Sequence, residues 1–440
     1  MGTVRVVAST TASPASTRIP VRIPTPLGPR ESTHLRRSVR SDTQRKLGPV
    51  RVKRTAALPF LVTAVLIGVA ACAGGAPAPS PESRAPAPSA TATPTPTPID
   101  PIAAWVDERM SQLTLEQKSA ALLMLHAPGT DPAPLRALVD AGASGLILMG
   151  DNIPATPAEL AALTAALEVD PEAPPLIGID EEGGEVQRLH WDDAASAEGL
   201  RAAPPAASRD AFSLRARYLA DGGISANFGI VADVTADPGS FIFGRVLGTD
   251  PAGSADRVAA AVEGERGVVA STLKHFPGHG AAPGDSHLSV PSAPLTIDEW
   301  RAGPSLPFQS GIDAGAEMVM TGHLAYPAID AAPASLSLEW HRILRDDLGF
   351  DGIVVTDDML MLQHNGLPEF ADPGENAVRA VAAGADLLLY VLPADPAEFG
   401  ISVSSLAGAI AAAVQNGRIS EERLDDAVTR VLTMRRALST

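Results

Sequence analysis

The stretch DGIVVTDDM, residues 351–359, is a run of apolar and β-branched side chains that ends in two aspartates. A run that is apolar along its whole length suits a strand covered on both faces, because a half-exposed strand would alternate apolar and polar residues. Seven similar runs recur between Ala-rich helical segments, at 121–127, 145–150, 175–180, 226–234, 268–276, 316–324 and 386–393. Eight alternating units of this kind predict an α/β fold of parallel strands, a (β/α)8 TIM-type barrel in a single domain over residues 101–440.

An open, doubly wound sheet is the alternative to a barrel. Most runs have polar residues at the C-terminal end, namely Asp180, Asp233, Lys274 with His275, His323, and Asp357 with Asp358. In a closed barrel these ends converge on one mouth, where the active sites of this fold lie. Contact with solvent alone would explain one or two such residues but not five runs, so the pattern favours the barrel.

Charge is divided unevenly along the 440 residues. The formal net charge is −17, yet residues 1–71 carry twelve Lys or Arg side chains against Glu31 and Asp42. The remainder is therefore strongly acidic and would repel phosphate backbones, so we expect no nucleic-acid partner.

The region before residue 101 reads as an export and anchoring segment. Residues 50–71 combine a basic start, an apolar run at 55–66 and small residues that lead into Cys72, the only cysteine. VAAC resembles a bacterial lipobox, so we expect an exported lipoprotein, held on the extracytoplasmic face of the cell membrane by a lipid on Cys72. A buried thiol beside a transmembrane anchor is the alternative. Residues 1–49 are expected to be a disordered extension or a gene start placed too early, and 72–100 a Pro-, Ala- and Thr-rich linker.

The segment KHFPGHGAAPGDSHL, residues 274–288, gathers ionisable groups on an irregular loop. His275 and His279 have the spacing of a helical zinc pair, but Pro277 and Gly278 between them prevent a regular turn, so we expect no metal. Asp285 and His287 are two residues apart, and a carboxylate bonded to an imidazole fixes its tautomer and raises its pKa. The segment therefore suits proton transfer, although such a pair alone is more often structural.

Two other acidic segments could face a ligand. In GIDEEGGEVQRL, residues 178–189, Asp180 stands at a strand end and is expected to point into the mouth; a solvated acidic turn is the alternative. Of the pair that ends DGIVVTDD, Asp357 is still on the strand and is the better placed to be held rigidly.

Seven motifs together resemble glycoside hydrolase family three, specifically its single-domain β-N-acetylglucosaminidase branch. They are IDEEGGEVQRL, RVLGTDP, KHFPGHG, DSH, MTGHLAYP, PASLS and GFDGIVVTDDM, in this order. The resemblance implies Asp357 as nucleophile and His287 as general acid/base, with Asp285 as its partner. It also implies that the sugar is bound by Asp180, Arg188, Arg245, Lys274 and His275, with His279 stabilising the loop. The chain departs from the usual RSFG at Arg245-Val-Leu-Gly and after Arg188.

The resemblance further implies an exo-acting, retaining hydrolase that removes terminal β-linked N-acetylglucosamine from peptidoglycan-derived or related glycans. It would form a covalent glycosyl-enzyme and need no cofactor, and we expect a monomer with a carbohydrate substrate. Three alternatives stay open: a phosphorylase, another β-glycosidase of the family, and a catalytically silent glycan-binding lipoprotein.

Overall fold

The computed structural model of the protein describes residues 100–439. The expected extension at 1–49, the signal at 50–71, Cys72 and the linker up to residue 99 lie outside the described residues.

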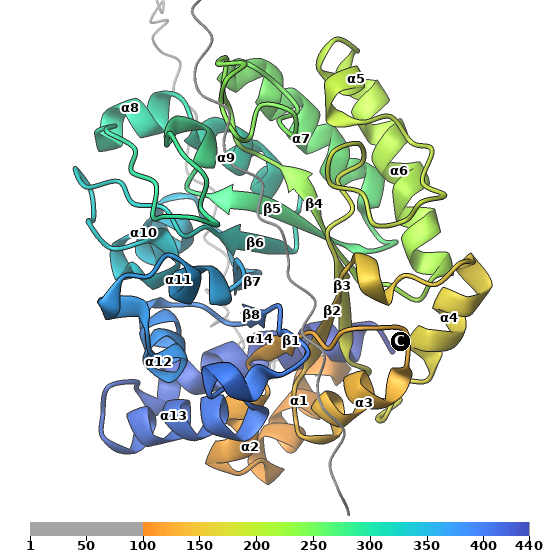
Figure 1. Ribbon diagram of the computed structural model, residues 1–440, viewed down its shortest axis with the longest axis vertical. Helices are drawn as coiled ribbons and strands as arrows, with labels where there is room; N and C mark the ends of the chain where they lie inside the picture. Colours follow the sequence, from red (N-terminus) through yellow and green to blue (C-terminus); the bar gives the residue numbers. More distant parts are fainter. Residues whose placement is uncertain (1–99, 440) are drawn as a thin grey trace, which may run out of the picture. The chain divides into compact units, whose positions relative to one another are not determined.

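Eight parallel strands form the centre of the fold, and helices surround them (Figure 1). The order of hydrogen-bonded neighbours is β7-β6-β5-β4-β3-β2-β1-β8. The strands are β1 Leu123–Leu125, β2 Gly145–Leu148, β3 Leu176–Ile179, β4 Ala226–Val231, β5 Ala270–Phe276, β6 Met318–Thr321, β7 Ile353–Thr356 and β8 Leu388–Tyr390. Each lies within one of the eight apolar runs, which confirms the predicted strands.

The sheet closes between β7 and β8. Val355 pairs with Leu387 in a parallel bridge. The N–H of Leu387 donates to the carbonyl of Val354 (3.1 Å), and the N–H of Met359 donates to that of Leu389 (2.9 Å). The prediction of a (β/α)8 barrel rather than an open sheet is thereby confirmed.

The helices follow from capping signals and apolar faces. Several begin with an Asp or Thr N-cap followed by Pro, a pairing that satisfies a free N–H and presets the first helical φ. Thr114 and Gln117 form a capping box at the start of α2. The helices are α1 Pro101–Gln112, α2 Leu115–Ala120, α3 Pro132–Asp140, α4 Pro157–Ala165, α5 Ala197–Arg201, α6 Pro205–Asp221, α7 Pro251–Glu265, α8 Ile297–Ala302, α9 Ser305–Asp313, α10 Leu338–Arg342, α11 Leu360–His364, α12 Pro373–Ala383, α13 Val403–Gln415 and α14 Glu421–Ala437.

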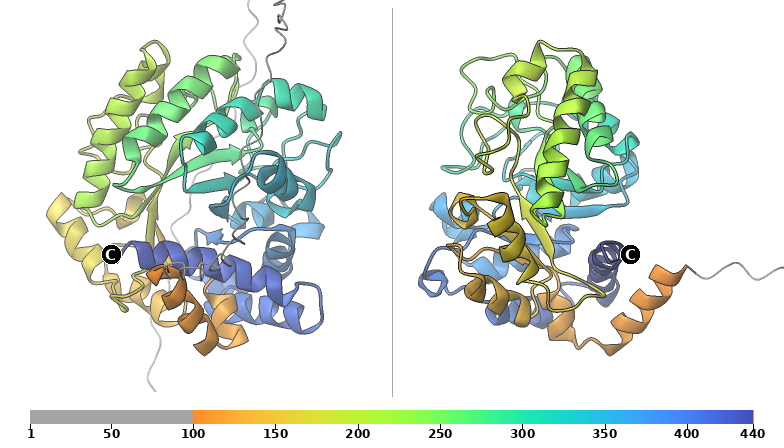
Figure 2. Two further views of the ribbon diagram at one scale, coloured as in Figure 1. Left: turned by 180° about the vertical axis from the view of Figure 1, so that it is seen from behind. Right: turned by 90° about the vertical axis from the view of Figure 1, so that its right-hand side faces the viewer.

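Two C-terminal elements complete the fold. The long helix α14 packs against α1. Figure 2 shows that α1, in orange, lies outside the ring of helices around the barrel. The segment Pro396–Gln415 is long and apolar enough to cross a membrane by composition alone. However, its side chains Val403, Leu406 and Ile410 are buried in the core that α13 shares with α2 and α12, so we interpret it as a core helix.

The interior of the barrel is filled by side chains, among them Met124, Ile147, Phe228, Met320 and Leu389. A Cβ at Gly178 on β3 would lie 2.8 Å from the ring of Phe228, so only glycine leaves room for that ring. Because the interior is packed, a ligand can enter only at the mouth.

Candidate active site

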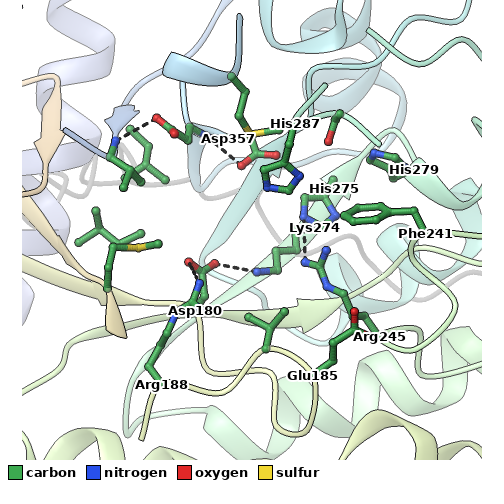
Figure 3. Close-up of a pocket in the computed structure, with 18 residues that line it drawn as sticks. Asp180, Glu185, Arg188, Phe241, Arg245, Lys274, His275, His279, His287 and Asp357 are labelled. Carbon is green, nitrogen blue, oxygen red and sulfur yellow. Dashed lines mark hydrogen bonds and ion pairs between the residues drawn. The ribbon is translucent and has the colours of Figure 1, made fainter. Parts of the chain in front are cut away.

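A pocket of about 370 Å³ lies at the C-terminal ends of the strands. Its polar lining is Asp180, Glu185, Arg188, Arg245, Lys274, His275, His279, Ser286, His287, Asp357 and Asp358. Figure 3 shows how the labelled side chains converge from β5 and from the loops that follow β3, β4, β5 and β7. Every predicted site residue therefore lines one pocket except Asp285, which lies behind His287 and binds it.

Lys274 on β5 is the centre of a buried charge cluster. Its ammonium nitrogen lies 2.8 Å from Asp180 Oδ1 and 2.7 Å from Glu182 Oε1. Arg245 donates to the same Glu182 through Nε (2.9 Å) and Nη2 (2.6 Å). Burial alone would raise the pKa of Asp180 and of Glu182, but the charge of Lys274, with Arg188 at Asp180 and Arg245 at Glu182, lowers both. The cluster therefore presents fixed charges of both signs to a ligand.

Asp233, at the end of β4, holds two histidines in place. Its Oδ2 accepts from Nδ1 of His275 (2.8 Å), and its Oδ1 accepts the backbone N–H of His279 (2.5 Å). Burial opposes its ionisation, but His275 and His279 lower the pKa of Asp233. With Nδ1 engaged, Nε2 of His275 is left to accept from Arg245 (3.4 Å) at the pocket wall. Burial also lowers the pKa of His279, which favours the neutral form of this imidazole.

The two aspartates after β7 have different environments. Asp357 Oδ1 accepts only the N–H of Asp358 (2.8 Å) among the described residues, which leaves its other oxygen to the pocket. Asp358 Oδ1 instead accepts two backbone N–H groups, from Leu360 (3.1 Å) and Val391 (2.9 Å). Asp357 is therefore the better placed of the two to meet a ligand.

Asp285 and His287 form the expected pair. Nδ1 of His287 lies 2.7 Å from Asp285 Oδ1, and the backbone N–H of His287 donates to the same oxygen (2.9 Å). Although partial burial opposes it, these contacts lower the pKa of Asp285. A carboxylate on Nδ1 leaves Nε2 for a reacting group. Figure 3 shows His287 beside Asp357 at the pocket.

Several residues of the site were missed from the sequence. Glu182 was quoted within a motif but given no role, although it bridges Lys274 and Arg245. Phe241 and Glu185 also line the pocket; Phe241 lies outside every recognised motif. The departure at Val246 and Leu247 places both side chains in the core rather than in the pocket, so it affects loop packing.

Comparison with known proteins identifies the family of the chain. Residues 107–434 match the family model described as the glycosyl hydrolase family 3 N terminal domain. A β-hexosaminidase of Stenotrophomonas maltophilia strain K279a is 36% identical over 229 residues, which cover 50% of this chain and 68% of the relative. One of Thiobacillus denitrificans is 34% identical over 287 residues, covering 61% and 77%.

Solved structures point to the same family. A glycoside hydrolase family 3 β-N-acetylglucosaminidase from Paenibacillus sp. FPU-7 superposes with a TM-score of 0.68 at 36% identity, covering 74% of this chain and 64% of that one. A β-N-acetylhexosaminidase from Beutenbergia cavernae gives a TM-score of 0.64 at 31% identity, covering 74% and 99%. The chain therefore belongs to glycoside hydrolase family 3, and it is a glycoside hydrolase that acts on O-glycosyl bonds.

Proposed function

We propose that the protein is an exo-acting, retaining β-N-acetylglucosaminidase. The observation that carries the proposal is the arrangement of an Asp285–His287 pair and the Asp357 carboxylate around one pocket. The relatives named β-hexosaminidase and β-N-acetylglucosaminidase support the choice of sugar.

Two displacements at the anomeric carbon account for hydrolysis with retention. In the first, the Asp357 carboxylate attacks the anomeric carbon while Nε2–H of His287 protonates the departing glycosidic oxygen. In the second, His287 takes a proton from water, whose oxygen displaces Asp357. Asp285 stabilises the imidazolium. A histidine in place of a second carboxyl group avoids like-charge repulsion with Asp357.

The pocket favours a chain end over an internal sugar. Its floor is formed by Ile147, Met149 and Leu389 above the filled barrel interior, so a glycan cannot pass through. The fixed charges around Lys274 supply donors and acceptors for sugar hydroxyl groups. We therefore assign the terminal residue to this pocket and the leaving group to the open side beside His287.

The natural substrate and the location of the protein belong to the same proposal. An exported lipoprotein would meet peptidoglycan fragments outside the membrane, so we infer terminal N-acetylglucosamine on such fragments as the substrate. Mass spectrometry of the membrane fraction should find a mature chain that begins at a lipidated Cys72. An intact N-terminus upstream of Cys72 would refute the anchor.

A panel of aryl β-glycosides tests the activity directly. The N-acetylglucosaminide should be cleaved faster than the glucoside or the xyloside, with the same products in phosphate-free and phosphate buffers. A 5-fluoro glycosyl inactivator should add its sugar to the peptide that holds Asp357. Formation of a sugar phosphate would instead identify a phosphorylase, and no cleavage of any glycoside would leave only a binding protein.

A further inference from the structure

The loop that carries His287 is held to the barrel by few polar contacts. Within the part of the chain that the structure describes, residues 283–289 hydrogen-bond only to one another, as in Leu288 N–H to the Asp285 carbonyl (3.1 Å) and Ser289 to the same oxygen (3.3 Å). The Asp285–His287 bond is internal to this loop, so it orients the ring within the loop but does not fix the loop over the pocket. The side chain of His287 is 59% exposed.

Phe241, on the loop between β4 and α7, connects the His287 loop to the barrel through ring contacts. Its ring centroid lies 5.8 Å from that of His287 in an edge-on arrangement and 5.7 Å from that of His279. His279 is the end of the loop that Asp233 fixes to β4. One ring thus contacts both His279, which Asp233 holds in place, and the imidazole of His287; Figure 3 labels all three side chains.

Phe241 itself is held firmly from behind. It packs on a small buried cluster of Val231, Ile242 and Val246, where Val231 is the last residue of β4. On its other side the guanidinium of Arg245 lies 5.9 Å from the ring centroid. A ring held on the barrel in this way can limit the movement of residues 283–289, which form no hydrogen bond to the barrel.

We propose that Phe241 is a positioning residue for the acid/base: it sets where the His287 imidazole stands over the pocket. This inference rests on the proposed function, because it takes His287 as the group that protonates the leaving group and then activates water. A displaced imidazole would impair proton transfer while leaving the sugar pocket and Asp357 intact. A misplacement of about 1 Å can cost ~10²-fold in rate.

The test compares leaving groups across variants. For Phe241→Ala and Phe241→Leu, kcat/KM on a 2,4-dinitrophenyl N-acetylglucosaminide should fall much less than on a sugar-linked disaccharide, because this phenolate leaves without a proton. On the sugar-linked disaccharide, kcat/KM should fall by about 10- to 100-fold. Added azide should accelerate turnover of the dinitrophenyl substrate by these variants, since an anionic nucleophile needs no base. Phe241→Tyr, which keeps the ring, should resemble the parent.

Phe243 provides a matched control two residues away. Its ring contacts Arg201 and does not line the pocket, so Phe243→Ala should leave the dependence on leaving group unchanged. Phe241→Leu keeps an apolar side chain on Val231, Ile242 and Val246 and carries the test if the alanine variant does not fold. Equal losses on both substrates, or a Phe241→Tyr variant as impaired as Phe241→Leu, would overturn the proposal.

The same experiment separates this inference from the proposed function. The sugar preference of the parent tests the function, whereas the ratio of variant to parent across leaving groups tests Phe241. The ratios are measured on whichever glycoside the parent cleaves. If the parent cleaves none, the function and the inference fail together; if it cleaves one and the ratios are flat, only the inference fails.

Discussion

Adjacent carboxyl groups at the end of β7 differ in charge because their neighbours differ. Burial opposes ionisation of both side chains. At Asp357, interactions with His275 and His323 and the N–H of Asp358 outweigh burial and lower the pKa. At Asp358, burial and the nearby charge of Asp357 prevail over two backbone N–H groups and raise the pKa to about 7. Between these two pKa values Asp357 is ionised while Asp358 is largely protonated, which suits Asp357 for nucleophilic attack.

Isosteric substitutions should therefore separate the two aspartates. Asp357→Asn should lower kcat on an aryl N-acetylglucosaminide by about 10³-fold or more, because an amide cannot form the glycosyl ester. Asp358→Asn should stay within about 10-fold at pH 6, since its amide oxygen can still accept from Leu360 and Val391 and little charge is lost. If Asp358→Asn were the inactive variant, the assignment of the nucleophile would be wrong.

His287 has to serve both chemical steps, so its loss should affect them differently. With a nitrophenyl N-acetylglucosaminide, His287→Ala should release a rapid burst of phenolate and then turn over slowly, because water attacks the intermediate without a base. Sugar-linked substrates should lose ~10²- to 10⁴-fold. Asp285→Asn should show a milder defect, since it removes only the partner of Nδ1. Cleavage of disaccharides by His287→Ala near the parent rate, without a burst, would exclude the pair as acid/base.

Residues within compact motifs could be predicted, while those joined only by the fold could not. Lys274, His275, Asp285 and His287 lie within fifteen consecutive positions. The spacing of Asp285 and His287 suggests proton transfer, and the family resemblance supplies the roles of Lys274 and His275. Phe241 meets His287 only because the loops after β4 and β5 lie side by side. A phenylalanine in a loop of ordinary composition gives no signal of such a contact.

Among the secondary-structure elements, one side chain connects the β7–β8 closure of the barrel to two helical segments outside it. Asp386, just before β8, is fully buried. Its Oδ2 accepts the N–H of Val354 on β7 (2.9 Å) and pairs with Arg345 (2.5 Å) in η4, Ile343–Asp347. Its Oδ1 pairs with Arg423 and, at 3.4 Å, Arg430, both on α14. One carboxylate thus pairs with three guanidinium groups.

Neutralising that carboxylate should destabilise the protein strongly. Asp386→Asn should cost about 3–5 kcal/mol, the usual range when a buried member of an ion pair is removed, because three partly buried guanidinium groups lose their counter-charge. Tm should fall by several degrees. Glu375→Gln is the control, because Glu375 pairs with Arg418 at an exposed site and such pairs contribute little. Thermal unfolding followed by circular dichroism compares the two. A smaller decrease in Tm for Asp386→Asn than for Glu375→Gln would show that Asp386 does not stabilise the β7–β8 closure.

The strands could be predicted because a strand buried on both faces is apolar along its length. The residues at which each strand begins and ends could not. The run at 316–324 contains β6 only as Met318–Thr321. Beyond Thr321 the chain leaves the sheet, and the Nε2 atom of His323 bonds to the Asp358 carbonyl (2.9 Å). Closure between β7 and β8 rests on contacts between distant segments, such as Asp386 with α14, that no local pattern reports.

Across residues 100–439, this acidic protein also buries carboxyl groups that form no ion pair. Glu265 on α7 and Glu181 after β3 both have side chains that are fully buried. Asn227 on β4 connects them, donating to Glu265 Oε1 (2.5 Å) and to the Glu181 carbonyl (3.1 Å). Burial raises the pKa of each glutamate to about 8, so the folded protein holds two extra protons at neutral pH.

Such raised pKa values make stability fall as the pH rises. A proton held more tightly in the folded state stabilises it fully below the unfolded pKa of about 4.5, and the contribution is lost by about pH 8. Burial lowers the pKa of His279 and His323, and their contribution is lost only as the pH falls below 6.5. Between pH 6.5 and 8 the buried carboxyl groups therefore dominate the pH dependence.

We accordingly expect Tm of the parent to decrease from pH 6.5 to pH 8. Glu265 alone should contribute about 2 kcal/mol to this decrease, at 1.36 kcal/mol per pH unit. Glu265→Gln keeps an oxygen for Asn227 and should reduce the slope by somewhat less than half, because Glu181 and Asp358 still retain raised pKa values. Glu263→Gln, at an exposed position on the same helix, should leave the slope unchanged. A parent Tm that stays level over this range, or an unchanged slope in Glu265→Gln, would show that these carboxyl groups ionise without cost to the fold.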